Sequence, residues 1–276
     1  MWTYQGILVL ILAFIGQPSL HVEDALRRGA HMTVDRGDIR ISVLYDNRAY
    51  AHACEPAWGF SCVVSGTAKT ILFDTGGDGS ILLHNMERLS IDPGEVDIIV
   101  LSHNHWDHTG GLESFLEQRG EVTLFVPRSF PSRFRKNVER FGAEVVDVTG
   151  PVEICDGVHS TGELGGRIKE QSLIVQTGNG TVVITGCAHP GIVGIVEQAR
   201  EIVDGDVLLV IGGFHLLEAG KSDLADIIHR FRDLQVRYVA PCHCTGDDAI
   251  TGFKDEYKEN WIEIGAGKIL SINELK

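Results

Sequence analysis

The chain has 276 residues, of which 43% are hydrophobic and 22% are charged. This length and composition exclude a largely disordered chain and allow one large domain or two small ones. The formal net charge of −14 excludes broad electrostatic coating of nucleic acids, although a local pocket could still bind a phosphate group. The 12 His residues are an unusual number and need a chemical explanation.

The N-terminus is apolar and lacks basic residues. Residues 1–20 contain no charged side chain, and residues 7–15 form an unbroken apolar run. The run is short for a bilayer span, and no Lys or Arg precedes it as in a secretory signal. We therefore expect a cytoplasmic protein, with export or membrane anchoring by residues 1–20 kept as the alternative. Residues 1–37 are interpreted as an N-terminal extension, and residues 38–276 as one domain.

From residue 38 the chain alternates strand-like and helix-like patterns, which predicts an α/β fold. Short apolar runs predict strands at 39–45, 60–65, 69–74, 96–101, 122–127, 172–177, 181–186, 206–212, 236–240 and 268–272. Apolar residues spaced three and four apart predict helices at 80–91, 111–119, 129–141, 191–204, 222–234 and 247–258. No internal repeat or linker is visible, which favours one domain over two.

One short segment concentrates potential metal ligands. Residues 102–111 read SHNHWDHTGG and follow a predicted strand, at the strand end where α/β folds place their sites. The four potential ligands are His103, His105, Asp107 and His108. Side chains two apart in extended chain share a side, so the two His can bind one ion, while the Asp-His pair faces a second. Imidazole and carboxylate suit zinc, iron or manganese, and the cluster predicts a two-metal site.

This segment resembles the His-x-His-x-Asp-His signature of the metallo-β-lactamase superfamily. The resemblance extends over residues 38–276 and implies a four-layer αββα sandwich. It also implies two ligand sets, which are His103, His105 and His189 for one ion and Asp107, His108 and His243 for the other. His189 lies in GCAH (186–189) and His243 in PCHCTG (241–246), each after a predicted strand. Asp74 in LFDTG matches the acidic residue that supports the ligands of this superfamily without binding the ion.

The chain departs from the superfamily pattern at two places. Where many members have Gly-Asp with a carboxylate that bridges both ions, this chain has Thr185-Gly186-Cys187. Either Cys187 supplies a thiolate ligand, or hydroxide alone bridges the ions. The usual segment with the third histidine is also missing before residues 172–177, so His189 is the expected replacement.

Segments such as LYDN (44–47), KEQS (169–172), TGCAHPGI (185–192) and GGFHL (212–216) resemble a narrower subgroup. That subgroup includes the archaeal synthase that joins a pterin to ribofuranosylaminobenzene phosphate. His215, after an apolar run, is either a general acid, a contact to a substrate oxyanion, or a structural imidazole. Lys169 either contacts a substrate phosphate or carboxylate, or is solvated. Asp46 and Asn47 follow the first predicted strand and are interpreted as a turn cap.

The resemblance implies a metal-dependent hydrolase in which a metal-bound hydroxide attacks an ester, phosphodiester or lactone, with Asp107 as a further catalytic base. The first alternative is a transferase that joins a dihydropterin pyrophosphate to an aminobenzene ribotide phosphate. The second is a non-hydrolytic diiron redox or metal-sensing protein. The expected cofactors are two divalent transition-metal ions, zinc first, with iron or manganese as alternatives. The expected partner is a small molecule, phosphorylated in the transferase alternative, and a homo-oligomer is left open.

Overall fold

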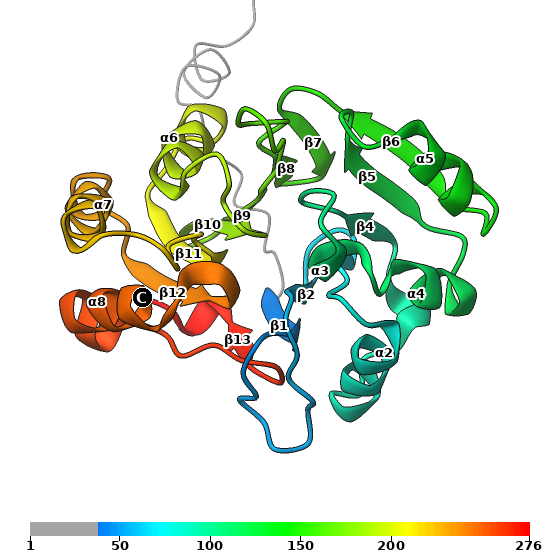
Figure 1. Cartoon of the computed structure of the whole chain (residues 1–276), viewed down its shortest axis with the longest axis horizontal. Helices are drawn as coiled ribbons and strands as arrows, with labels where there is room; N and C mark the ends of the chain where they lie inside the picture. The colour runs from blue at the N-terminus through cyan, green and yellow to red at the C-terminus, as the bar shows by residue number, and fades with distance from the viewer. Residues whose placement is uncertain (1–37) are drawn as a thin grey trace, which may run out of the picture. The chain divides into compact units, whose positions relative to one another are not determined.

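The computed structural model describes residues 38–276 (Figure 1). The N-terminal segment at 1–37, and with it the choice between cytoplasmic location and export, lies outside the described residues. Within residues 38–276, no helix combines the length and the apolar composition that crossing a membrane requires. The strands of this part of the chain form two mixed sheets.

The first sheet has seven strands in the order β13-β1-β2-β3-β4-β5-β6. Their bounds are β1 Arg40–Tyr45, β2 Ser61–Ser65, β3 Ile71–Phe73, β4 Ile98–Val100, β5 Thr123–Pro127, β6 Glu144–Val148 and β13 Ile269–Ser271. From β13 to β3 the neighbouring strands are antiparallel, and from β3 to β6 they are parallel. Parallel neighbours need a crossover, which the helices α2 (Gly79–Arg88), α4 (Leu112–Gln118) and α5 (Ser132–Glu139) provide.

The second sheet has six strands in the order β12-β11-β10-β9-β8-β7. Their bounds are β7 Val152–Cys155, β8 Val158–Ser160, β9 Leu173–Thr177, β10 Gly180–Thr185, β11 Val207–Gly213 and β12 Tyr238–Cys242. The strands β10, β11 and β12 are parallel and are joined by α6 (Ile192–Ile202) and α7 (Lys221–Asp233). The helix α8 (Asp247–Tyr257) follows β12.

Three apolar clusters stack the sheets and helices into four layers. Side chains alternate along β1, so Ile41 and Val43 join a cluster shared by both sheets while Leu44 packs with α2 and α4. A third cluster lies between the second sheet and α6, α7 and α8. Full burial of one such aliphatic side chain contributes about 1.5–3 kcal/mol, so these clusters stabilise the stacking of the layers. The predicted αββα sandwich is confirmed.

Every predicted strand and helix is present, with ends shifted by at most three residues. The structure adds β6, β7 and β8, which the sequence analysis did not predict, and the short helix α3 (Trp106–Thr109) inside the histidine-rich segment. Short 3-10 helices, also not predicted, lie at Pro93–Glu95, His243–Thr245, Lys258–Asn260 and Ile272–Glu274. The interpretation of residues 38–276 as one domain stays a prediction.

Candidate metal centre

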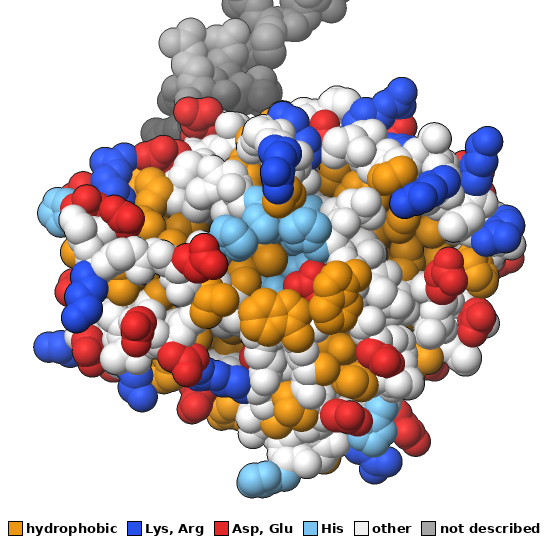
Figure 2. Space-filling model, in the orientation of Figure 1, with side chains coloured by type: hydrophobic (Ala, Val, Ile, Leu, Met, Phe, Trp, Pro, Cys, Tyr) orange, Lys and Arg blue, Asp and Glu red, His pale blue; other side chains and the backbone are white. Residues whose placement is uncertain are grey.

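The predicted ligands follow strands of both sheets and meet at one edge of the fold. Residues 103–108 follow β4 of the first sheet, whereas His189 follows β10 and His243 follows β12 of the second sheet. Figure 2 shows His side chains gathered at the centre of the face in view, with hydrophobic side chains directly below them. The structure therefore brings side chains far apart in the sequence to one surface site.

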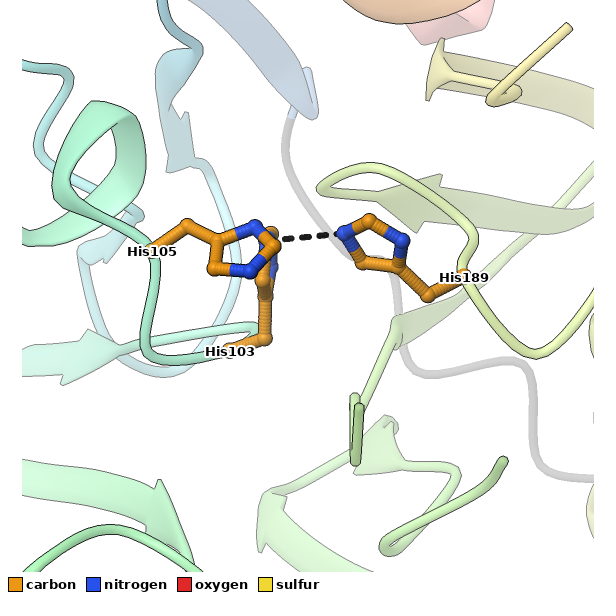
Figure 3. Close-up of side chains that lie close together, drawn as sticks. All are labelled: His103, His105 and His189. Carbon is orange, nitrogen blue, oxygen red and sulfur yellow. Dashed lines mark hydrogen bonds between the residues drawn. The ribbon is translucent and has the colours of Figure 1, made fainter. Parts of the chain in front are cut away.

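The first group consists of three imidazoles. His103 Nε2 lies 3.0 Å from His105 Nδ1 and 3.3 Å from His189 Nε2. Figure 3 shows the rings of His105 and His189 approaching each other from opposite sides of the site, next to His103. All three ligand nitrogens lie within 4.8 Å of one another, which is the spacing that one shared ion requires.

The second group consists of Asp107, His108 and His243, whose ligand atoms also lie within 4.8 Å of one another. His243 Nε2 is 3.4 Å from Asp107 Oδ2, and His108 Nε2 is 3.8 Å from the same oxygen. All three residues are buried. The groups are adjacent, because the rings of His103 and His108 have centroids 4.3 Å apart.

Hydrogen bonds from Asp74 set which imidazole nitrogens can bind a metal. The Asp74 carboxylate accepts from Ser102 N, Ser102 Oγ and His108 Nδ1, each at 2.7 Å. Because the Ser102 hydroxyl donates to Asp74, its oxygen accepts from His103 Nδ1, 2.9 Å away. With both Nδ1 atoms donating, the Nε2 lone pairs of His103 and His108 point into the site. Asp74 therefore contacts two of the predicted ligand segments, and its supporting role at a bound metal stays a prediction.

His243 is held in the same way by residues after β1. The ring Nδ1 of His243 lies 3.1 Å from Asn47 Oδ1. The backbone N–H of His243 donates to Asp46 Oδ2 at 3.0 Å, and its backbone carbonyl accepts from Asn47 Nδ2 at 2.9 Å. Asp46 Oδ1 does cap a turn by accepting from Arg48 N, so the turn interpretation was incomplete rather than wrong. Within residues 38–276, the buried His243 Nε2 has no hydrogen-bond partner, which fits a ligand position.

Two supporting residues were missed. Glu170 is fully buried, and its carboxylate accepts from the backbone N–H groups of Cys187, Ala188 and His189 at 2.8–2.9 Å. It therefore shapes the loop that carries His189, where Ala188 has a positive φ of 61°. Trp58 Nε1 donates to Asp107 Oδ2 at 2.9 Å. In the segment 169–172, the sequence predicts Lys169 as a candidate contact to the substrate, and Glu170 was not predicted.

The electrostatics of the site favour the metal-binding form of His103, His189 and Asp107. For His108, burial lowers the pKa, but the Asp74 carboxylate outweighs burial and raises it. Burial, together with the neighbouring imidazoles, lowers the pKa of His103 well below its ordinary value and that of His189 to about 4. Burial alone would raise the pKa of Asp107, but the adjacent imidazoles of His243 and His108 lower it to about 2. Neutral imidazoles beside an ionised carboxylate are the donors that divalent transition metals prefer. The residues present fit two such ions.

The family model for the metallo-beta-lactamase superfamily matches residues 59–243, a span that runs from the loop before β2 to the last predicted ligand. The chain belongs to the metallo-β-lactamase superfamily. Members of this superfamily typically bind metals, and four of the six side chains in the two groups belong to the segment 103–108 that resembles its signature motif. Binding of ions by these particular residues stays a prediction.

The chain is also similar to named members of the superfamily. It is 30% identical to the 7,8-dihydropterin-6-methyl-4-(beta-D-ribofuranosyl)-aminobenzene-5'-phosphate synthase of Methanocaldococcus jannaschii, over 84% of this chain and 96% of the relative. It is 29% identical to Tm1679, a metal-dependent hydrolase of the beta-lactamase superfamily, whose crystal structure it matches with a TM-score of 0.70 over 84% of this chain and 98% of that one. A diphosphatase of the PhnP family shares the fold at 17% identity, with a TM-score of 0.56 over 84% of this chain and 97% of that one.

Cys187 is the residue that the superfamily resemblance places where a bridging carboxylate was expected. Its Sγ is 3.2 Å from His108 Nε2, and it forms a group with His103 and His108 whose ligand atoms lie within 4.8 Å. The thiol therefore lies between the two ligand groups. A thiolate ligand at Cys187 and a bridging hydroxide alone both remain compatible with this position.

Of the other two candidates, His215 lies against a predicted ligand, whereas Lys169 bonds within its own loop. The His215 ring has its centroid 4.2 Å from that of His189, and its nitrogen lies within 4.8 Å of the sulfurs of Cys187 and Cys244. His215 is exposed and has a positive φ of 54°, so it faces the solvent side of the ligands. Lys169 Nζ donates to Gly165 O at 2.6 Å, which engages its ammonium group within its own loop.

Proposed function

We propose that this superfamily member is a hydrolase that uses two divalent transition-metal ions, zinc first, to cleave an ester, phosphodiester or lactone bond of a small molecule. The observation that carries this proposal is the adjacency of the two ligand groups, with the Nε2 lone pairs of His103 and His108 directed between them. The similarity to Tm1679, which is described as a metal-dependent hydrolase, supports it.

Bound ions would activate water as a nucleophile and stabilise negative charge on the substrate. The chain supplies the remaining functions through its own residues. Trp58 holds one oxygen of Asp107 by a hydrogen bond of 2.9 Å, which orients the carboxylate to accept a proton from the nucleophile. His215, exposed beside His189, would donate a proton to the leaving group.

A second function is favoured by a specific comparison. The relative from Methanocaldococcus jannaschii is named as a synthase, and it matches this chain over nearly its whole length. In the corresponding transfer, the amine of an aminobenzene ribotide phosphate would form a C–N bond to the dihydropterin methylene carbon. The C–O bond to pyrophosphate would break, and pyrophosphate and the amine proton would leave. The Cys187 thiol in place of a bridging carboxylate fits a reaction that differs from that of the common hydrolases.

The test combines elemental analysis with a substrate panel in ¹⁸O-labelled water. The panel contains esters, phosphodiesters, lactones, and a pterin pyrophosphate together with its aminobenzene ribotide phosphate acceptor. The variants are His103→Ala and Asp107→Ala, with His229→Ala on the exposed face of α7 as the matched control. We expect about two metal ions per chain. Both site variants should lose activity by at least about 100-fold, whereas the control keeps it.

The label distinguishes the two reactions. Hydrolysis places one ¹⁸O atom in the product, whereas transfer gives a coupled pterin product without label. A metal-free protein with full activity, or wild-type activity in both site variants, would refute both functions.

A further inference from the structure

Two cysteines meet beside the metal centre although they are 57 positions apart in the sequence. Cys187 follows β10 and Cys244 follows β12, and these two strands lie on either side of β11. The sulfurs of the two residues lie within 4.8 Å of each other. Cys244 Sγ also donates to the backbone carbonyl of Cys187 at 3.5 Å. The fold therefore places two thiols side by side at the ends of strands that do not pair with each other.

A glycine at the end of the intervening strand allows this approach. Gly213 is the last residue of β11. A Cβ atom at this position would lie 2.7 Å from Cys244 Sγ and 3.2 Å from Cys187 Cα. The first distance is well below the van der Waals separation of carbon and sulfur, so any side chain at position 213 would displace the Cys244 thiol.

The two thiols are close enough to be joined and can be reached by a small oxidant. A disulfide requires about 2.0 Å between its sulfurs, and rotation of the two side chains brings the atoms together from their present separation. Cys187 and Cys244 keep 3% and 5% of their surface exposed, so neither is sealed from water. The exposed ring of His215, with a nitrogen within 4.8 Å of both sulfurs, marks the side on which the pair meets solvent.

A bond between the two cysteines would change the metal centre. Cys187 Sγ is 3.2 Å from His108 Nε2 and forms a group with His103 and His108. A bond to Cys244 would constrain this sulfur and remove its capacity to become a thiolate, which is the form that binds metal. Cys244 also directly follows His243, so the same bond would constrain the backbone of a predicted ligand from the second sheet.

We propose that Cys187 and Cys244 are a reversible redox pair, which peroxide converts into a disulfide, and that this disulfide weakens metal binding at the adjacent centre. The inference rests on the proposed function only in treating the neighbouring side chains as metal ligands. Formation of the disulfide itself follows from the positions of the two thiols.

The oxidation has two steps. The sulfur of one thiol gives up its proton, attacks one oxygen of hydrogen peroxide and breaks the O–O bond. The departing hydroxide takes the proton and leaves as water, and a sulfenic acid remains. The second sulfur then attacks the sulfenic sulfur, so that an S–S bond forms and the S–O bond breaks, and the hydroxyl group leaves as water with the second thiol proton. Two electrons pass from the sulfurs to the peroxide. A small dithiol reverses the reaction by exchange and becomes a disulfide itself.

The test treats the purified metal-loaded protein with hydrogen peroxide and locates the modified cysteines by mass spectrometry. We expect the intact protein to lose two hydrogen atoms, and its digest to contain a peptide pair linked through Cys187 and Cys244. Two of the six thiols should become unreactive towards a maleimide. A competitive titration should show that the oxidised protein binds zinc at least about tenfold more weakly. Treatment with dithiothreitol, followed by its removal, should restore the affinity.

Cys244→Ser and Cys187→Ser should each abolish the linked peptide pair. The matched control is Cys242→Ala, because Cys242 is equally buried but belongs to the apolar cluster shared by both sheets. This variant should still form the disulfide and lose zinc affinity on oxidation. Because the linked peptides are identified in the wild-type protein, the test does not depend on the folding of any variant.

Six reactive thiols after peroxide treatment, added oxygen atoms in place of the disulfide, or a disulfide between other cysteines would overturn the proposal. A Cys187–Cys244 disulfide that leaves zinc affinity unchanged would overturn its link to the metal centre. If the disulfide forms and zinc affinity falls in a protein that converts no substrate of the panel, the proposed function is refuted and the redox pair is kept.

Discussion

Glu170 offers the sharpest test of how the site is built. In Glu170→Gln one acceptor oxygen becomes an amide NH₂ group, so a buried backbone N–H of the 187–189 loop faces a donor. The unsatisfied N–H costs about 1–3 kcal/mol, and the two bonds that remain weaken because the acceptor is no longer charged. Burial raises the pKa of the Glu170 carboxyl, so relief of that desolvation offsets part of the loss.

We expect a net destabilisation of about 3 kcal/mol. For a domain of this size that loss lowers Tm by about 6–12 °C. Because Glu170 holds the backbone of His189, metal affinity should also fall by about 10–100-fold, the range found for residues that orient metal ligands. Thermal unfolding and a competitive zinc titration measure the two effects.

The matched control is Glu163→Gln, in the same loop. Glu163 also accepts from a backbone N–H, that of Ser129 at 2.6 Å, but at the surface. Its replacement should change stability by no more than about 0.5 kcal/mol and leave zinc affinity unchanged. The reasoning fails if Glu170→Gln is as stable as this control and binds zinc equally well.

Three further predictions concern the same centre. Gly186→Ala places a Cβ atom 2.1 Å from Ser102 Oγ, so we expect a loss of about 1–3 kcal/mol in the free energy of unfolding, measured by urea denaturation. If Cys187 is a ligand, the cobalt-loaded protein should show a thiolate charge-transfer band. Cys187→Ala should abolish this band, whereas the control Cys54→Ala should keep it. An unchanged band in Cys187→Ala would refute ligation. Removal of the ions by a chelator should lower stability by about 2.7 kcal/mol for each bound ion, relative to protein at a free metal concentration of 100 Kd, and an unchanged Tm would contradict metal binding.

The ligands could be predicted because their signal is local. Four of the six lie within residues 103–108, whereas His189 and His243 are predicted through the superfamily resemblance and through their positions after predicted strands. The supporting residues carry no such signal. Asn47 contacts His243 across 196 positions of the sequence, and Glu170 is an ordinary acid in a polar loop until the fold buries it.

The missed strands have a related cause. The strands β7 and β8 have four and three residues and flank the turn at Asp156-Gly157, a typical hairpin signal that their short length obscured. The strand β6 lies at the edge of its sheet and is partly exposed, so its apolar pattern is weak. Its extended conformation depends on pairing with β5, which local sequence does not encode.

Each ligand group takes two side chains from the segment that follows β4 of the first sheet. The third side chain comes from the second sheet and is His189 in one group and His243 in the other. Each ion would therefore be a cross-link between the two halves of the sandwich as well as a reaction centre. Metal supply in the cell would then govern how long the protein survives, since a chain without ions opens more often between its sheets and exposes more backbone to proteases. The amount of protein would thus follow the availability of its metal.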